Sequence, residues 1–183
     1  MMRELGCHVI EADPLAHQLM EPGQAAYEEV VLTFGAGILS PERRIDRRKL
    51  GEIVFADFEK LLALNRIVHP RVIEAIDGEL ADAARSGEKN LAVVEAALLI
   101  ESGYYEKLDR LIVVWCRPEQ QRERLLARGI SPEQIERRIV AQMPLEQKRR
   151  MADDEIDCSG SLSATKQQVE RLVARLKQLA AAS

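Results

Sequence analysis

Aromatic residues, cysteines and long apolar runs are all scarce in this sequence, and each scarcity excludes a class of protein. Aromatic side chains make up 4 % of the 183 residues, too few for a stacking platform that binds single-stranded nucleic acid. The three cysteines, Cys7, Cys116 and Cys158, form no C-x-x-C pair, which argues against structural zinc. No apolar run approaches the about 18 residues of a membrane span. We therefore expect a protein of the reducing cytoplasm that binds neither nucleic acid nor membrane.

A glycine-rich phosphate loop is also missing. None of the ten glycines is followed by lysine, so the pattern G-x-x-x-x-G-K-[ST] does not occur. The net charge of −4 gives no general affinity for polyanions. Any phosphate chemistry must therefore depend on a local cluster of basic side chains.

Short apolar runs and helical periodicities alternate along the chain and predict an α/β fold. Residues 7–10, 91–94 and 111–115 are expected to be strands, the last two buried on both faces of a parallel sheet. Between the first two strands, residues 14–87 are predicted to be almost entirely helical, with a break at His69-Pro70. Ile156 marks a short last strand, and an amphipathic helix ends the chain. We expect buried thiols at Cys7 and Cys116.

The first strand ends in two carboxylates, Glu11 and Asp13. Residues two apart on a strand share a face, so both side chains are expected at the carboxyl end of the strand, where open α/β sheets bind ligands. An aspartate there can accept a proton from a hydroxyl group. Asp13 before Pro14 is equally a helix N-cap pattern, and the two interpretations are compatible.

Basic residues gather in two places. The larger group lies on two short predicted helices between residues 117 and 152, which could close over a nucleotide. Interleaved glutamates leave the alternative of a solvated face. The smaller group, Arg47, Arg48 and Lys49, follows a predicted cap at Asp46, and it is either a phosphate site or a solvated turn. His17, one helical turn after Asp13, could border a site. A purely structural histidine is the alternative for His8, His17 and His69.

Taken together, the motifs resemble the dephospho-CoA kinase family over residues 3–176. The resemblance rests on several motifs in order: Glu11-Ala-Asp13 with His17, Glu21-Pro-Gly23, Ile45-Asp46-Arg47, Leu64-Asn65, His69-Pro70, Leu98-Leu99-Ile100-Glu101, Arg138-Ile139 and Ala152-Asp153-Asp154. The family transfers a phosphate from ATP to the ribose 3′-hydroxyl of dephospho-CoA, with Mg²⁺ bridging the phosphates. The resemblance implies a single domain with a three-layer, P-loop kinase-like parallel sheet. It also implies a helical CoA-binding region over about 14–87 and a lid over about 117–152.

The resemblance assigns roles to individual residues. Asp13 matches the acid that takes the proton from the 3′-hydroxyl. The acceptor side is implied at Glu11, His17, Arg47, Lys49, His69 and Glu101. Arg138 matches a lid arginine over the ATP phosphates, and Arg128 and Lys148 are placed beside it. Cys158 falls near the adenine, where the family usually has asparagine.

One departure from the family concerns the phosphate loop. The family opens with a strand and the G-x-x-x-x-G-K-[ST] loop, which cradles phosphate with its backbone amides. We therefore expect an N-terminally incomplete chain that transfers no phosphate as it stands. A non-catalytic protein that binds CoA or a nucleotide is the first alternative. A related small-molecule or nucleotide kinase is the second.

Overall fold

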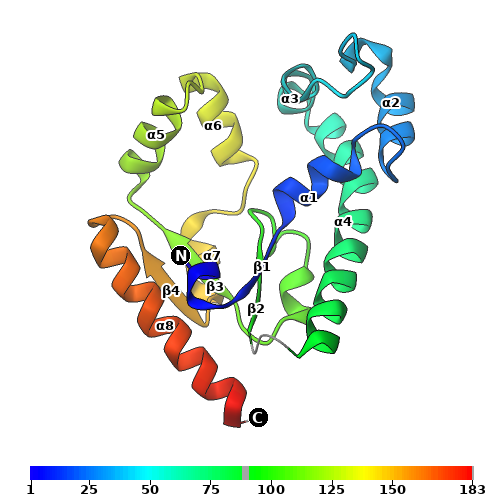
Figure 1. Cartoon of the computed structure of the whole chain (residues 1–183). Coiled ribbons are helices and arrows are strands. Elements are labelled where there is room, and N and C mark those ends of the chain that lie inside the picture. The colour runs from blue at the N-terminus through cyan, green and yellow to red at the C-terminus, as the bar shows by residue number, and fades with distance from the viewer. Residues whose placement is uncertain (88–90, 183) are drawn as a thin grey trace. The chain divides into compact units, whose positions relative to one another are not determined.

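The computed structural model describes residues 1–87 and 91–182, which cluster into two compact units (Figure 1). The strand unit comprises Met1–Val9, Ser86–Val93 and Ala97–Ser183, and the helical unit comprises Ile10–Arg85 and Val94–Ala96. In chain order the elements are η1 (Arg3–Leu5), β1 (His8–Glu11), α1 (Ala12–Leu19), α2 (Tyr27–Phe34), η2 (Ala36–Ile38), α3 (Arg47–Ala56), α4 (Phe58–Ser86), β2 (Ala92–Glu95), η3 (Tyr104–Lys107), β3 (Ile112–Trp115), α5 (Pro118–Ala127), α6 (Pro132–Val140), α7 (Leu145–Met151), β4 (Asp154–Asp157) and α8 (Leu162–Ala182).

The helical unit confirms the predicted helical stretch, and its helices end at the residues that the sequence marks. Gly35 follows α2 with a φ of 81°, a conformation that favours glycine. Asp46 caps α3, because its carboxylate accepts hydrogen bonds from the backbone amides of Arg48 and Lys49. Between α2 and α3, residues Leu39 and Ile45 form an antiparallel bridge. These turns fix the first residues of α3 within the unit.

The predicted break at His69-Pro70 does not occur. Helix α4 continues through Pro70 from Phe58 to Ser86, although proline removes one helical hydrogen bond and its ring crowds the preceding turn. Buried side chains on both sides, among them Val68 and Val72, hold the helix together across the proline. Arg71 adds a hydrogen bond to the carbonyl of Ile67 at 2.5 Å. Tertiary packing therefore overrides the local signal.

We expect Pro70→Ala to stabilise the chain. Alanine restores the missing backbone donor in mid-helix, so the free energy of unfolding should rise by about 1–3 kcal/mol. Urea unfolding monitored by circular dichroism measures this change. Glu74→Ala, an exposed substitution on the same helix, is the matched control and should stay within about 0.5 kcal/mol. A loss of stability in Pro70→Ala would mean that the packing of α4 requires the proline.

The strand unit contains a parallel pair formed by β3 and β4. Its register sets Ile112 opposite Asp154 and Trp115 opposite Asp157. Strand β1 pairs with β2, and no pairing joins these two strands to β3 or β4 within the described residues. The α/β class is thus confirmed. The expectation of strands covered on both faces is wrong for the described structure, because Val114 is 59 % exposed and both ends of β2 are exposed.

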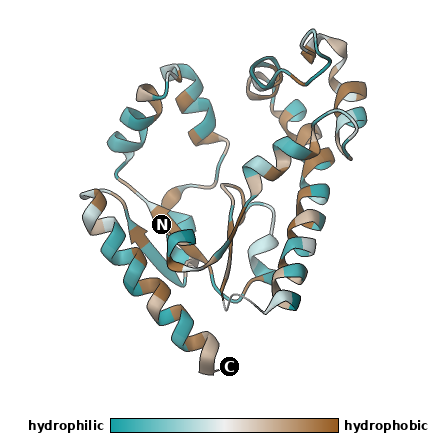
Figure 2. Ribbon diagram, viewed as in Figure 1, coloured by the Kyte–Doolittle hydropathy of each residue, from teal (hydrophilic) through white to brown (hydrophobic). Residues whose placement is uncertain are grey.

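Helix α8 covers β4 and supplies three buried residues of one of the two apolar clusters of the strand unit. Its buried residues Val169, Leu172 and Val173 pack with Ile156 of β4 and with Cys7. Alternating teal and brown along α8 and α4 in Figure 2 shows the amphipathic pattern that the sequence predicts. The buried thiol is confirmed for Cys7, which has no exposed surface. It is wrong for Cys116, which is only partly buried because β3 is ending there.

Candidate functional site

Strand β1 passes directly into α1 with no intervening loop. Ile10, 2 % exposed, and Ala12, 7 % exposed, anchor the junction. Glu11 occupies the cap position without a side-chain capping bond, and Asp13 lies in the first turn of α1. The predicted capping role of Asp13, with Pro14 as first helical residue, is therefore wrong, because the helix begins two residues earlier. An acid in the first turn is favoured by the helix dipole.

His17 lies on α1 one turn after Asp13 and is influenced by two of the predicted site residues. Burial is the main cause that lowers the pKa of His17 below its ordinary value. The positive charge of Arg47 lowers this pKa further, while Asp13 acts in the opposite direction. Since these charges act on one imidazole ring, α1 and α3 bring Asp13, His17 and Arg47 into one neighbourhood.

The first turn of α3 begins with three cations and contains no acidic residue. This is the unfavourable end of a helix for positive charge. Arg48 is paired with Glu52 at 3.7 Å, and Lys49 Nζ donates to the carbonyl of Leu39 at 3.4 Å. Arg47 is exposed, and its guanidinium has neither a hydrogen bond nor an ion pair within the described chain. Of these three cations, the one that acts on His17 is thus the one without a side-chain partner in the described part of the chain.

His69 lies inside α4 rather than in a helix break. Its ring is half-buried, and burial lowers its pKa below the ordinary value. Within residues 1–87 and 91–182 the ring makes no hydrogen bond or ion pair. The structure therefore keeps His69 in the same unit as Asp13, His17 and Arg47, but joins it to none of them by a polar contact.

The two lowered histidine pKa values predict a stability that falls with acid. The unfolded chain takes up protons first, near the ordinary histidine pKa of ~6.5, whereas the folded chain resists protonation. The stability that these two neutral rings contribute should therefore be complete above about pH 7.5 and decline as the pH falls through about 6.5 toward the lowered pKa values of the folded chain. Urea titrations at several pH values measure it. His17→Gln combined with His69→Gln should flatten this slope, and an unchanged slope would contradict the burial of both rings.

A second group of predicted residues forms in the strand unit. One carboxylate oxygen of Glu101 accepts hydrogen bonds from Lys148 Nζ at 2.8 Å and from the backbone amide of Met143 at 2.8 Å. Lys148 Nζ also donates to the carbonyl of Ala97 at 2.9 Å. Burial acts to raise the pKa of Glu101, but these hydrogen bonds outweigh it and the net shift is downward. The sequence prediction places Glu101 and Lys148 on opposite substrates, whereas the structure makes them partners.

Several arginines of the 117–152 region are paired with the interleaved glutamates. Arg122 of α5 makes a two-pronged ion pair with Glu136 of α6, at 2.7 and 3.2 Å. Arg137 pairs with Glu133 at 2.7 Å. Arg128 is exposed at the end of α5 and has no ion pair among the described residues. Arg138 of α6 is half-buried. The solvated-face alternative thus holds for part of the cluster.

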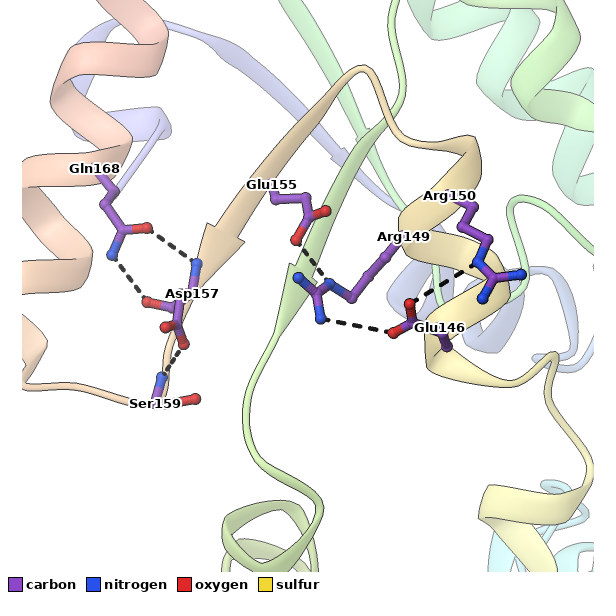
Figure 3. A network of polar contacts seen from close by, with 7 residues as sticks. All are labelled: Glu146, Arg149, Arg150, Glu155, Asp157, Ser159 and Gln168. Carbon is purple, nitrogen blue, oxygen red and sulfur yellow. Dashed lines mark hydrogen bonds and ion pairs between the residues drawn. The ribbon is translucent and has the colours of Figure 1, made fainter.

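Figure 3 shows an ion-pair network that links α7 to β4. Arg149 bonds to Glu155 at 2.7 Å and approaches Glu146 at 3.7 Å. Its guanidinium also lies over the ring of Trp115, 4.2 Å from the ring centre. Sequence reasoning did not find this stack, and the only available signal was the single tryptophan at the end of an apolar strand. The network fixes α7 against the β3–β4 pair.

The end of β4 is held from α8. Gln168 donates to the backbone carbonyl of Asp157 at 2.9 Å and accepts from its amide at 3.0 Å (Figure 3). Hydrogen bonds from Ser159 lower the pKa of the Asp157 carboxyl. Cys158 follows, and its carbonyl accepts a hydrogen bond from Arg124 at 2.8 Å. The structure therefore places Cys158 beside α5, with its side chain packed against the core of the strand unit.

Comparison with known proteins identifies the class to which this arrangement belongs. The family model described as dephospho-CoA kinase matches residues 1–164. The dephospho-CoA kinase of Aquifex aeolicus is 45 % identical over 176 residues, which cover 96 % of this chain and 88 % of the relative. That of Symbiobacterium thermophilum is 45 % identical over 171 residues, 93 % of this chain and 71 % of the relative.

Solved structures of two bacterial proteins have the same fold as this chain. The Thermus thermophilus protein TT1252 superposes with a TM-score of 0.75 at 31 % identity and covers 96 % of this chain and 87 % of its own. A dephospho-CoA kinase from Campylobacter jejuni gives a TM-score of 0.67 at 28 % identity, and the match covers 96 % of this chain and 88 % of that protein.

The chain is a phosphotransferase of the kinase class with an α/β fold, and ATP is the co-substrate of its family. It belongs to the dephospho-CoA kinase family. Helices in the described part of the chain are not long and apolar enough to cross a membrane.

Proposed function

We propose that the helical unit binds dephospho-CoA at the start of α1 and the first turn of α3, with Asp13 as general base. The observation that carries this proposal is Arg47, which has no ion pair or hydrogen bond from its guanidinium in the described residues and acts electrostatically on the same imidazole, His17, as Asp13 does. The remaining acceptor residues in the proposal are Glu11, Lys49 and His69. Glu101, which the family resemblance also places there, is bound to Lys148 in the strand unit.

The charge arrangement at α3 favours an anionic ligand. The dipole of the helix and the side chains of its first turn have the same sign, and Asp46 uses its carboxylate on two backbone amides. A phosphate oxygen near Arg47 would neutralise a charge that is paired with no acid among residues 1–87 and 91–182. Arginine binds phosphate with a planar fork of donors. The diphosphate of dephospho-CoA is an anion of this kind.

Asp13 is suited to the proton transfer. Its carboxylate is exposed at the start of α1, so a ribose hydroxyl can reach it. A carboxylate that accepts a hydrogen bond from the 3′-hydroxyl orients the nucleophile and takes its proton as the bond to phosphorus forms. The neighbouring His17 is held toward its neutral form by burial and Arg47, so it adds little competing positive charge.

The carboxylates at this end of β1 also fit Mg²⁺ as kinases bind it. Such sites use one or two carboxylates together with substrate phosphates rather than a dense protein cage. In the described residues no group of three or more His, Cys, Asp or Glu gathers into a metal site. Glu11 and Asp13 are the side chains that would hold the ion, and it would offset the charge of the transferring phosphate when bound.

A matched pair of substitutions tests the acceptor site. Arg47→Ala removes the partnerless cation, whereas Arg48→Ala removes its neighbour, which is already paired with Glu52. Isothermal titration of the 183-residue chain with dephospho-CoA should show affinity weakened about 10- to 100-fold in Arg47→Ala, the loss of one or two charged hydrogen bonds. Arg48→Ala should change the affinity less than about threefold. Equal losses, or none in Arg47→Ala, would contradict the site.

We further propose that the donor side is incomplete within these 183 residues. Arg128 and Arg138 remain candidates for the ATP phosphates, and Cys158 for the neighbourhood of the adenine. The sequence contains no G-x-x-x-x-G-K-[ST] loop. Strands β2 and β3 each have a described partner on one side only. In a three-layer kinase sheet, a strand that carries the phosphate loop would pair at such edges.

The two substrates should therefore behave differently. The chain should bind dephospho-CoA but release no measurable ADP from ATP in a coupled assay, because removing even one preorganised phosphate donor costs about 3–4 kcal/mol of transition-state stabilisation. Robust turnover would show that another element holds the phosphate. A folded chain without dephospho-CoA affinity would instead contradict the proposed acceptor site.

Binding without transfer also fits a non-catalytic CoA-binding protein. Transfer on addition of a loop-bearing strand would favour the kinase over the non-catalytic protein.

A further inference from the structure

Glu101 connects three segments of the strand unit through a single carboxylate. The residue lies in the turn that follows β2 and precedes η3. Its partners are Lys148 on α7 and the backbone amide of Met143, which belongs to the short link between α6 and α7. Lys148 returns to the same turn through the carbonyl of Ala97. The turn after β2 is therefore joined both to α7 and to the link that precedes it.

This ion pair is better protected from water than the others of the region. The side chain of Lys148 is 12 % exposed and that of Glu101 is 22 % exposed. Most exposed pairs contribute little to stability, whereas removing one partner of a buried pair leaves an uncompensated charge. Apolar contacts lie alongside, since Met143 and Leu145 pack against the cluster formed by Ile100, Leu111 and Val113. The turn and the link are thus joined by both polar and apolar contacts.

The link is one of the two chain connections between the α5–α6 pair and the rest of the strand unit, and α5 also contacts the end of β4 through Arg124 and the carbonyl of Cys158. Helices α5 and α6 stand out from the β3–β4 pair in Figure 1. They are held to one another by the Arg122–Glu136 ion pair, and Ile135 of α6 is 2 % exposed. Arg138 lies in the last turn of α6, five residues before Met143. The position of the link therefore contributes to where α6 and Arg138 lie, together with the contacts of α5 at the end of β4.

We propose that Glu101 and Lys148 are positioning residues: their contact fixes the link at residues 141–144 and thereby sets the orientation of α6, and neither side chain contacts a substrate. This assignment rests on the proposed function only for its effect on phosphoryl transfer. Its effect on the link is a property of the chain alone. The acid next to Ile100 then has a structural role: one carboxylate oxygen accepts hydrogen bonds from a backbone amide and from a largely shielded ammonium together.

Hydrogen–deuterium exchange of the 183-residue chain, followed by mass spectrometry, tests the proposal. Glu101→Ala removes the acceptor of the Met143 amide, so exchange in peptides over residues 141–145 should accelerate at least about tenfold. Glu101→Gln retains an acceptor and loses the charge, so it should show a smaller increase. Lys148→Met should behave like Glu101→Gln, because the Met143 amide keeps its acceptor. Glu106→Ala, an exposed acid on η3, is the matched control and should leave exchange unchanged.

Dephospho-CoA titration of the same variants separates positioning from direct contact. The affinity should stay within about threefold in Glu101→Ala and in Glu101→Gln, which also serves if the alanine variant does not fold. Unchanged exchange at 141–145 together with lost dephospho-CoA affinity would overturn the proposal and make Glu101 a substrate contact. If Arg47→Ala leaves the affinity unaltered while exchange at the link responds to Glu101, the acceptor site fails and the positioning role stands.

Discussion

The direct passage from β1 into α1 is the constraint on which the candidate acceptor site depends. Burial of Ile10 and Ala12 fixes the junction, and the helix that begins there carries Asp13 and His17 at a separation of one turn. A loop of even a few residues would free both side chains from this geometry. Helix α3 then needs only its Asp46 cap and the bridge between Leu39 and Ile45 to bring Arg47 within electrostatic range of His17.

The distribution of charge separates structural cations from candidate ligand-binding ones. Arg122, Arg137 and Arg149 are paired with glutamates: Arg122 joins α5 to α6, Arg149 joins α7 to β4, and Arg137 pairs within α6. Arg47 and Arg128 have no such partner in the described residues. The distinction is energetic as well as geometric, because a paired cation must break a protein contact before it can bind phosphate. Counting arginines in the sequence therefore overstates the phosphate-binding surface, and their partners identify which ones are available.

Local patterns predicted the elements well, because glycines, caps and apolar periodicity act over a few residues. Gly35 and the Asp46 cap lie where the sequence indicates. Failures occur where long-range packing decides: α4 continues through Pro70, Val114 is exposed on a strand that reads as fully buried, and α1 begins at Ala12 rather than at Pro14. The partnership of Glu101 with Lys148 joins residues 47 positions apart, and no periodicity within either helix or turn encodes it.

The central claim is that dephospho-CoA binds the helical unit at the start of α1 and of α3. Amide chemical shifts of the ¹⁵N-labelled chain, followed during titration with dephospho-CoA, test it most directly. The account predicts saturable shifts concentrated at residues 11–17 and 46–50, with Asp13 and Arg47 among those affected. In Arg47→Ala, the same shifts should need at least about tenfold more ligand. Shifts confined to α5, α6 and the end of β4, with α1 and α3 unmoved, would contradict it.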